Sequence, residues 1–208
     1  MKKQYGMLID LQRCVGCYGC QVTCKAEHNI PFGTFRCRVE THTSGTYPDI
    51  KKLFLPRLCN HCDNPPCMTK CTENALVKND DGVVELIHSD CISCGQCIDA
   101  CPYNSIDISH ITGRAEKCDF CHQRILKGLL PVCVQGCMGK AIIFGDIYDK
   151  KSEIYGELRK NQIKVLKPEL GTNPSVFYIV SGEIQSALLG DWQHTERKKS
   201  PARRRQQK

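Results

Sequence analysis

Short apolar runs separated by turn sequences predict a fold built mainly from small strand pairs. Ala75–Val77 and Val83–Ile87 flank the turn sequence Asn79–Gly82, and this arrangement predicts a β-hairpin. Ser105–Ser109 and Ala141–Phe144 are further segments that we expect to form closing strands. The expected strands are therefore only a few residues long.

Weaker patterns predict a second hairpin and a set of C-terminal elements. Phe35–His42 and Lys51–Leu55 alternate between apolar and polar residues, with Thr43–Asp49 as the connecting loop. The other segments that we expect to be regular are a short helix capped by Asp149 that runs through Asn161, and two strands that pack on the outside, Ile163–Leu166 and Val176–Val180.

The cysteines change this picture. The chain has 208 residues and 17 cysteines, and sixteen of these fall into four groups that each end in the step Cys-x-x-x-Cys. The groups are Cys14, Cys17, Cys20 and Cys24; Cys59, Cys62, Cys67 and Cys71; Cys91, Cys94, Cys97 and Cys101; and Cys118, Cys121, Cys133 and Cys137.

The cysteine spacing indicates iron–sulfur clusters. The first and third groups follow the bacterial ferredoxin spacing C-x₂-C-x₂-C-x₃-C, and sixteen thiolates suffice for four cubane clusters. Structural zinc also uses CxxC pairs, but it does not explain a third cysteine at +3 and a fourth at +4 in two groups. The odd cysteine count and the repeated spacing disfavour a disulfide framework. We therefore expect four [4Fe–4S] clusters, assembled in the reducing cytoplasm.

In bacterial ferredoxins the fourth cysteine of a run serves the neighbouring cluster. If each Cys-x-x-x-Cys step is helical, its fourth cysteine lies about 6 Å along the axis from the third, which brings two clusters close together. The predicted iron ligands are Cys14, Cys17, Cys20 and Cys137 for cluster 1; Cys59, Cys62, Cys67 and Cys101 for cluster 2; Cys71, Cys91, Cys94 and Cys97 for cluster 3; and Cys24, Cys118, Cys121 and Cys133 for cluster 4.

The hairpin between the second and third groups makes these groups one ferredoxin-like domain, which leaves the first and fourth groups to each other. The predicted fold class is α+β, with two bacterial-ferredoxin-like domains, one nested inside the other, short hairpins and a C-terminal extension. The expected boundaries are residues 1–36 and 110–147 for the outer domain, 37–58 for a connecting hairpin, 59–109 for the inner domain, 148–192 for the extension and 193–208 for a basic, disordered tail.

Positive charge is concentrated at the C-terminal end. The formal net charge is +7, and residues 193–208 carry seven Lys and Arg side chains against Glu196, a net +6 that leaves +1 for the rest. Such a run is typical of a solvated tail rather than a nucleic-acid site. The apolar stretch Val176–Leu189 is interrupted by polar residues, and Met1–Asp10 lacks an apolar targeting segment. We expect no nucleic-acid partner and no direct membrane span.

Several other residues adjoin the cysteines. The sixteen cysteines already satisfy four clusters, so we interpret His61 and His122 as residues around a cluster or on the surface, not as iron ligands. We expect Cys37 to be a buried or half-buried free thiol without a cysteine neighbour. Four cations can either raise cluster potentials or remain solvated: Lys25, Arg57, Lys70 and Lys117. No nucleotide-binding loop, nucleophile–base pair or carboxylate pair is recognisable, so we predict no catalytic residues.

With these residues the chain resembles the four-cluster iron–sulfur subunits of dimethyl sulfoxide reductase-family molybdenum complexes, such as polysulfide, thiosulfate, tetrathionate, arsenate and dimethyl sulfoxide reductases. The resemblance covers roughly residues 5–180 and includes four matching segments: Tyr5–Asp10, Cys59–Cys67, Glu116–Cys121 and Leu166–Thr172. In some relatives a tryptophan at the position of Cys94 accompanies a three-iron cluster, so Cys94 implies a fourth [4Fe–4S] cluster. Thr72 and Met138 stand where a proline often follows the fourth cysteine.

The resemblance implies a place in anaerobic respiration. Such subunits pass electrons between a large catalytic subunit with a molybdopterin cofactor and a multi-span membrane subunit that reacts with quinone. The implied location is at the membrane through these partners, either on the periplasmic or extracytoplasmic face by export with a signal-bearing partner or in the cytoplasm.

Two other classes of function remain open from the sequence alone. One is a stand-alone polyferredoxin that serves a hydrogenase or another oxidoreductase, and a co-purifying large subunit distinguishes it from the first interpretation. The other is a zinc-binding interaction module, which acid-labile sulfide and a brown colour would exclude.

Overall fold

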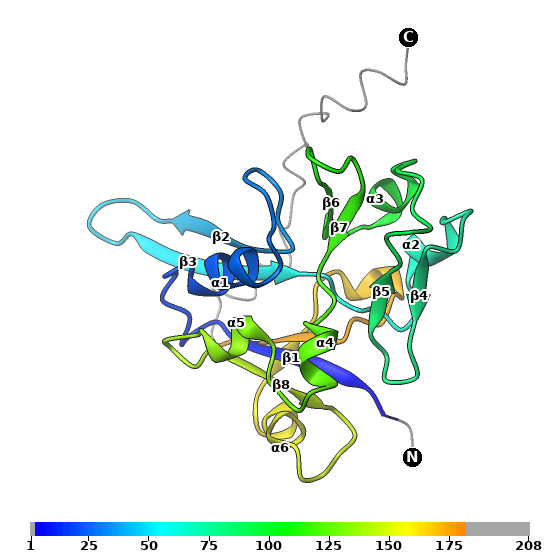
Figure 1. Cartoon of the computed structure of the whole chain (residues 1–208). Helices are drawn as coiled ribbons and strands as arrows, with labels where there is room; N and C mark the ends of the chain where they lie inside the picture. Colours follow the sequence, from blue (N-terminus) through cyan, green and yellow to red (C-terminus); the bar gives the residue numbers. More distant parts are fainter. Residues whose placement is uncertain (1–2, 182–208) are drawn as a thin grey trace.

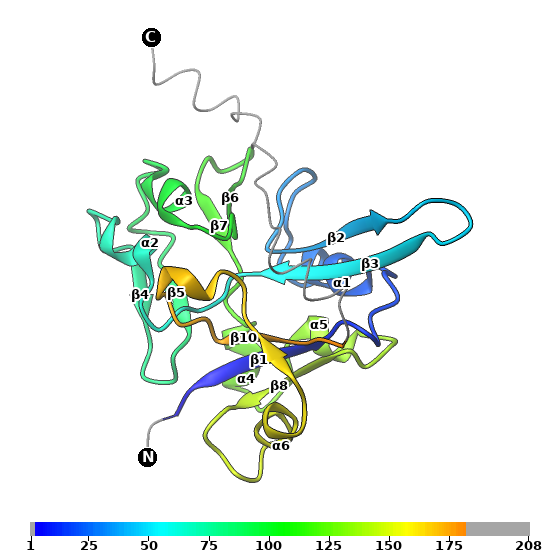
Figure 2. The same ribbon diagram turned by 180° about the vertical axis from the view of Figure 1, so that it is seen from behind.

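A four-stranded sheet forms one side of the protein in the computed structural model, which describes residues 3–181. β1 is antiparallel to β8 (Figure 1) and parallel to β10 (Figure 2). β9 pairs antiparallel with the other edge of β10. The strand order is β8–β1–β10–β9, with bounds Ile142–Asp146, Tyr5–Asp10, Val176–Ile179 and Ile163–Lys164.

β10 lies inside this sheet, so the prediction of an outer strand at Val176–Val180 is wrong. Val176 and Tyr178 are 0% and 1% exposed, and the Tyr178 hydroxyl donates a hydrogen bond to the Pro56 carbonyl at 3.1 Å. The expected strand at Ile163–Leu166 is shorter and ends at Lys164. An apolar run of four residues does not reveal which strand it will pair with, because pairing with β1 depends on a distant segment.

Helix α6 (Glu153–Lys160) packs against β1 and β8, where Ile154 is buried together with Leu8 and Ile179. It begins later than the sequence predicted, since Ser152 occupies the N-cap position. The Asp149 carboxylate instead accepts a hydrogen bond from the Lys151 N–H at 2.9 Å, so Asp149 forms the turn that precedes the helix.

The hairpin expected around residues 35–55 is present as β2 (Cys37–Ser44) and β3 (Lys51–Leu58). It projects to one side in Figure 1 and lies beside the loop of the first cysteine group. Gly16 in this loop has φ +66°, and a Cβ atom there would lie 2.3 Å from the Phe54 ring. Glycine is therefore required where the loop packs on the hairpin.

Two further strand pairs have three-residue strands. β4 (Leu76–Lys78) pairs with β5 (Val84–Leu86), as predicted for the hairpin after the second cysteine group. β6 (Ile106–Ile108) pairs with β7 (Ala115–Lys117), so this pair crosses the domain boundary that we expected between residues 109 and 110. The Ala141–Phe144 strand is also present, as β8.

The cysteine steps are less helical than predicted. Helix α1 (Gly19–Glu27) contains both Cys20 and Cys24. Three shorter helices end before the last cysteine of their group: α2 (Pro66–Thr69), α3 (Gln96–Ala100) and α5 (Val132–Gln135). One further short helix, α4 (His122–Ile125), follows Cys121, and a 3₁₀ turn occupies Pro168–Leu170.

A repeated turn explains why these helices stop. After each of the last three groups, the N–H three residues beyond the final cysteine donates to that cysteine's carbonyl: Asn74 to Cys71, Asn104 to Cys101 and Lys140 to Cys137, at 3.3, 3.2 and 3.0 Å. These three donor residues all have a positive φ. The turn reverses the chain directly into β4, β6 or β8, which leaves no room for a longer helix.

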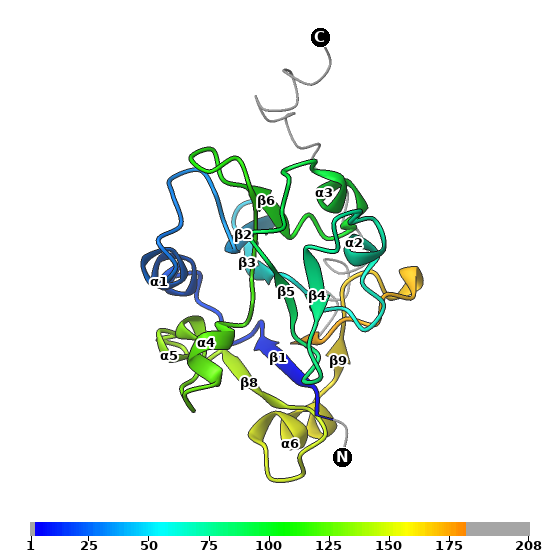
Figure 3. The ribbon, with the colours of Figure 1, turned by 45° about the vertical axis from the view of Figure 1, so that its right-hand side comes forward.

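The short helices pack in pairs. α1 contacts α5, and α2 contacts α3, so the first cysteine group lies beside the fourth and the second beside the third (Figure 3). The fold mixes helices and strands, which agrees with the predicted α+β class. Among residues 3–181, no helix is both long enough and apolar enough to cross a bilayer. The tail predicted at 193–208 and the end of the expected extension lie outside the described residues.

Candidate iron–sulfur centres

The four cysteine loops share one backbone feature. The residue directly before the second cysteine has a positive φ in every group: Gly16, His61, Ser93 and Phe120, with φ of 66°, 41°, 64° and 54°. Alternating left- and right-handed residues form concave arrangements of backbone N–H groups that suit anions. Only one of these residues is glycine, so the residue types do not reveal this shared turn.

Three cavities are each lined by four cysteines that come from two groups. The cavity volumes include space open to solvent. A cavity of ≈ 360 Å³ is lined by Cys14, Cys17, Cys20 and Cys137; one of ≈ 330 Å³ by Cys59, Cys62, Cys67 and Cys101; and one of ≈ 430 Å³ by Cys71, Cys91, Cys94 and Cys97. In each case three cysteines belong to one group and the last to its packing partner.

The remaining four predicted ligands also lie together. Of the neighbouring groups that act electrostatically on the Cys24 thiol, Cys121 has the largest effect, and Cys118 interacts electrostatically with Cys24, Cys133 and Cys121. Three of these cysteines lie in the segment around α4 and α5, and Cys24 lies in α1. All sixteen cysteines thus lie in four sets of four.

These sets fit [4Fe–4S] clusters by the chemistry of their donors. Four thiols around a common space are the ligand set of a cubane cluster. Asn60 lines the second cavity, is 2% exposed, and has no partner for its side-chain amide nitrogen within residues 3–181. A buried amide of this kind is costly unless it is satisfied, and a cluster sulfur would accept its hydrogen bond.

Burial favours the protonated form of several of these thiols. It raises the pKa of Cys24, Cys62 and Cys67 to about 12, and that of Cys97 to about 11. A metal ligand must be the thiolate, so binding of iron displaces these protons. The free energy of cluster binding therefore has to offset the cost of deprotonating these buried thiols.

Cys37 has a cysteine neighbour, contrary to the prediction. It is 5% exposed at the start of β2, and its thiol forms a hydrogen bond with the Cys20 sulfur. This bond and burial raise the pKa of Cys37, which remains the donor, whereas the bond lowers the pKa of Cys20. The prediction of a buried thiol is correct, but pairing of β2 with β3 brings it beside a predicted iron ligand.

The C-terminal segment reaches the second cysteine loop, which sequence reasoning did not foresee. Thr172 contributes a side-chain hydrogen bond to Cys62, and its carbonyl accepts the Asn64 N–H at 3.1 Å. The Ser175 N–H donates to the Asn60 carbonyl at 2.8 Å. Thr172 belongs to the Leu166–Thr172 resemblance segment, and this was its only signal in the sequence.

The four cations beside the cysteines differ in burial. Lys117 is 3% exposed, and its Nζ donates hydrogen bonds to the carbonyls of Val84 and Cys118. Arg57 is 6% exposed and forms an ion pair with Glu40 at 2.5 Å. Lys25 donates to the carbonyls of Pro31 and Thr34, and Lys70 is exposed. Only Lys117 and Arg57 are therefore shielded from solvent.

Both histidines inside the cysteine groups are buried, so the surface interpretation is wrong for each. His61 is 0% exposed, stacks on Phe120 with ring centroids 3.7 Å apart, and accepts the Val84 N–H at its Nδ1. Burial lowers its pKa well below 6.5. His122 contacts Asp81 and Glu85 at 3.0 and 2.8 Å.

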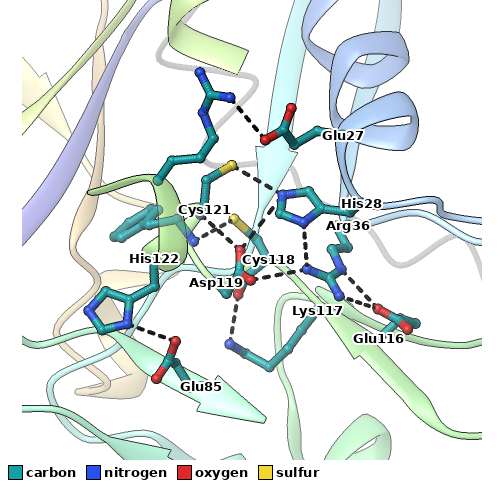
Figure 4. A network of polar contacts seen from close by, with 12 residues as sticks. Glu27, His28, Arg36, Glu85, Glu116, Lys117, Cys118, Asp119, Cys121 and His122 are labelled. Carbon is teal, nitrogen blue, oxygen red and sulfur yellow. Dashed lines mark hydrogen bonds and ion pairs between the residues drawn. The ribbon is translucent and has the colours of Figure 1, made fainter. Parts of the chain in front are cut away.

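A third histidine, which the sequence analysis overlooked, contacts a predicted iron ligand directly. His28 Nε2 lies 3.2 Å from the Cys121 sulfur, and the surrounding charged residues are shown in Figure 4. Burial is the largest influence on His28 and lowers its pKa. Its position four residues after Cys24, on the same helical face, was the available signal.

Family models match most of the cysteine-bearing chain. A 4Fe-4S dicluster domain matches residues 50–147, and a 4Fe-4S binding domain matches residues 11–27. These matches include all four cysteine groups.

Several curated proteins are similar over most of this chain. A tetrathionate reductase subunit of Salmonella typhimurium is 46% identical over 183 residues, which covers 86% of this chain and 73% of that protein. The arsenate respiratory reductase iron-sulfur subunit ArrB of Shewanella sp. is 34% identical, with 88% and 98% covered. A selenate reductase subunit of Mesobacillus selenatarsenatis is 35% identical, with 85% and 72% covered.

Proposed function

The chain belongs to the family of iron–sulfur electron-transfer subunits of dimethyl sulfoxide reductase-like respiratory reductases, and we propose that it passes electrons between a quinone-linked membrane subunit and a molybdopterin catalytic subunit. Bound [4Fe–4S] clusters supply one-electron chemistry. The residues of this chain hold the clusters, shield them from water and set their surroundings. It has no catalytic role of its own in this proposal.

The assignment of ligands is the basis of this proposal. Each cluster takes three cysteines from one group and one from its packing partner, in the four sets predicted from the sequence. One observation carries this assignment. Four cysteines line each of three cavities, and in every case three come from one group and the fourth from its packing partner. The electrostatic neighbours of Cys24 support the fourth set.

The same packing supports two nested ferredoxin-like domains. The contact of α2 with α3 joins the second and third groups as an inner domain, and the contact of α1 with α5 joins the first and fourth as an outer domain. The outer domain is continued by the pairing of β8 with β1. The connecting hairpin β2–β3 lies between the two in sequence.

We place the two ends of the relay at clusters 1 and 3. Of the seventeen cysteines, all within the described residues, Cys17 and Cys94 are exposed. Each has exposed apolar neighbours. Val15 lines the first cavity and is 63% exposed, and Met138, which follows Cys137 in the chain, is 81% exposed. Ile92 lines the third cavity and is 62% exposed. Exposed apolar residues around an exposed ligand suit the docking of a protein that exchanges electrons.

The location follows from the partners. Because attachment to the membrane is assigned to the quinone-linked subunit, the chain lies at the membrane surface without inserting. Of the two sides, we favour the extracytoplasmic face, reached by export of the folded subunit with a signal-bearing catalytic partner.

Purification from native membranes tests this function. We expect the chain to co-migrate with a much larger molybdenum-containing polypeptide. Val15→Glu and Ile92→Glu should each release one partner while the protein keeps about 16 iron and 16 sulfide per chain. The control is Ile111→Glu, because Ile111 is at least as exposed, at 72%, but lines none of the three cavities.

Two results would contradict the proposal. A free monomer that reduces several unrelated acceptors equally well would identify a stand-alone polyferredoxin. Stoichiometric zinc with little sulfide would exclude the electron-transfer function altogether.

A further inference from the structure

His28 follows helix α1 and lies beside the fourth cysteine set. Its backbone N–H donates to the Cys24 carbonyl at 3.2 Å, which fixes it one helical turn beyond a predicted ligand of cluster 4. Its side chain then reaches Cys121, a ligand from a segment 93 residues away, with Nε2 at 3.2 Å from the sulfur. The imidazole thus bridges the two segments that form this set.

Arg36 determines which nitrogen of His28 carries the proton. Its Nη1 lies 3.3 Å from His28 Nδ1. A guanidinium group has only donors, so Nδ1 is the acceptor and the proton of the neutral ring is on Nε2. The Nε2–H is therefore available to the Cys121 sulfur, which lies 3.2 Å from Nε2 (Figure 4). The Asp119 carboxylate also faces Nε2, but at 4.0 Å it lies beyond hydrogen-bond distance.

Arg36 is itself held by two carboxylates. Its Nε donates to Glu116 at 2.8 Å, and its Nη1 donates to Asp119 at 3.1 Å. The side chains of Arg36 and Glu116 are 11% and 12% exposed. A charged pair this shielded from water keeps one geometry, so the guanidinium is a rigid support for the imidazole.

A mononuclear metal site is the other interpretation of this cluster of residues. Ligand atoms of His28, Asp119 and Cys121 lie within 4.8 Å of one another. The guanidinium of Arg36, however, contacts both His28 Nδ1 and the Asp119 carboxylate. The positive charge of the guanidinium would repel a divalent cation. The hydrogen bond from Arg36 to Nδ1 instead suits a neutral imidazole that donates from Nε2.

We propose that His28 raises the reduction potential of cluster 4 by donating an N–H···S hydrogen bond to Cys121, and that Arg36 acts as its positioning residue. This inference rests on the proposed ligand sets. Reduction places one more negative charge on the cluster, so a donor to a ligating sulfur stabilises the reduced form more than the oxidised form. Backbone N–H groups also donate to predicted ligands, for example from Phe120 to Cys118 at 3.3 Å, but a side chain can be replaced.

Redox titration of the purified complex, followed by electron paramagnetic resonance, tests the role of His28. His28→Phe keeps the ring volume but removes the donor, and it should lower the reduction equilibrium constant of one cluster about tenfold, or about 59 mV for one electron. His28→Gln retains an N–H and should restore part of the shift. Arg36→Lys should give a smaller shift of the same sign. His110→Phe, at an exposed histidine, is the matched control and should change nothing.

An unchanged potential in a His28→Phe protein with full iron content would overturn the inference, as would loss of one extra metal ion per chain. If His28→Phe loses cluster 4, wild-type protein labelled with ¹⁵N-histidine decides the question. Its reduced cluster should show weak hyperfine coupling to one histidine nitrogen, and absence of that coupling would refute the hydrogen bond. Cys24→Ser and Cys121→Ser test the ligand set separately, because they should perturb the same signal. If the two cysteine variants perturb different signals, the ligand set is wrong. That conclusion holds even if His28→Phe shifts the same signal that Cys121→Ser perturbs.

Discussion

At the scale of single residues, burial decides which charges can act on a cluster. Lys117 and Lys70 both adjoin a cysteine in the sequence, but Lys117 is 3% exposed and Lys70 is exposed. Lys117 also acts electrostatically on Cys67, a predicted ligand of cluster 2. Water and salt screen the exposed lysine, whereas the buried one keeps most of its influence.

Replacing Lys117 should therefore lower the potential of cluster 2. A unit charge at roughly 8 Å and an effective dielectric constant near 20 contributes about 2 kcal/mol. We expect Lys117→Met to shift cluster 2 to lower potential in a redox titration, with little dependence on salt. Lys70→Met is the matched control and should leave every potential unchanged. Equal shifts of the cluster 2 potential in the two variants would show that burial of the lysine does not determine its effect.

At the scale of elements, the pairing of helices matters more than the length of each one. The step between the third and fourth cysteines is fully helical only in α1, yet the fourth cysteine still reaches the neighbouring set in the other groups. The turn after Cys71, Cys101 and Cys137 fixes this position by its own hydrogen bond. The short helix and the turn together replace the longer helix that the spacing predicted.

Crossed ligation can be tested with two cysteines of one group. Cys137→Ala should damage cluster 1, since Cys137 lines a cavity with Cys14, Cys17 and Cys20. Cys133→Ala should instead damage cluster 4. Each variant should lose one distinct electron paramagnetic resonance signal. If both variants lost the same signal, each group would bind its own cluster and the nested arrangement would be wrong.

We also expect the C-terminal elements to be required for cluster 2. Truncation after Leu166 removes β10 and the Thr172 contact to Cys62, so we expect loss of iron from cluster 2 and a sharp fall in thermal stability. The control truncation, after Trp192, should retain all iron. Equal iron content in the two truncated proteins would contradict the structural role of residues 167–181.

At the scale of the whole molecule, we expect two parts to depend on iron to different degrees. The four-stranded sheet buries Met7, Leu8, Ile9 and Val176 completely. The core around β4 to β7 consists of Cys67, Leu76, Val84, Ile106 and Ala115, with four further cysteines packed against it. Three-residue strands around so small a core are not stable alone, so the clusters supply much of its folding free energy.

Iron removal should separate these parts. After chelation under reducing conditions, we expect amide hydrogen exchange to become fast in β4, β5, β6 and β7 while β1, β8 and β10 retain protection. Reconstitution with iron and sulfide should restore protection in all of them. Simultaneous loss in both parts would instead indicate one cooperative unit.

The sequence by itself determined the chemistry and much of the local structure. Cysteine spacing specifies a cofactor because ligation depends on residues a few positions apart, and the Asn79–Gly82 turn specifies its hairpin for the same reason. The α+β class was predicted from these local patterns, and the family resemblance rests on the segments that carry them.

Only the tertiary structure decided the long-range contacts. The burial of β10, the approach of Thr172 to Cys62, the hydrogen bond between Cys37 and Cys20, and the bridge from His28 to Cys121 all join residues far apart in the chain. Residue type and periodicity describe the environment along one segment. They carry no information on which distant segment will pack against it, because that depends on how the sheet, the hairpin and the cysteine sets close together.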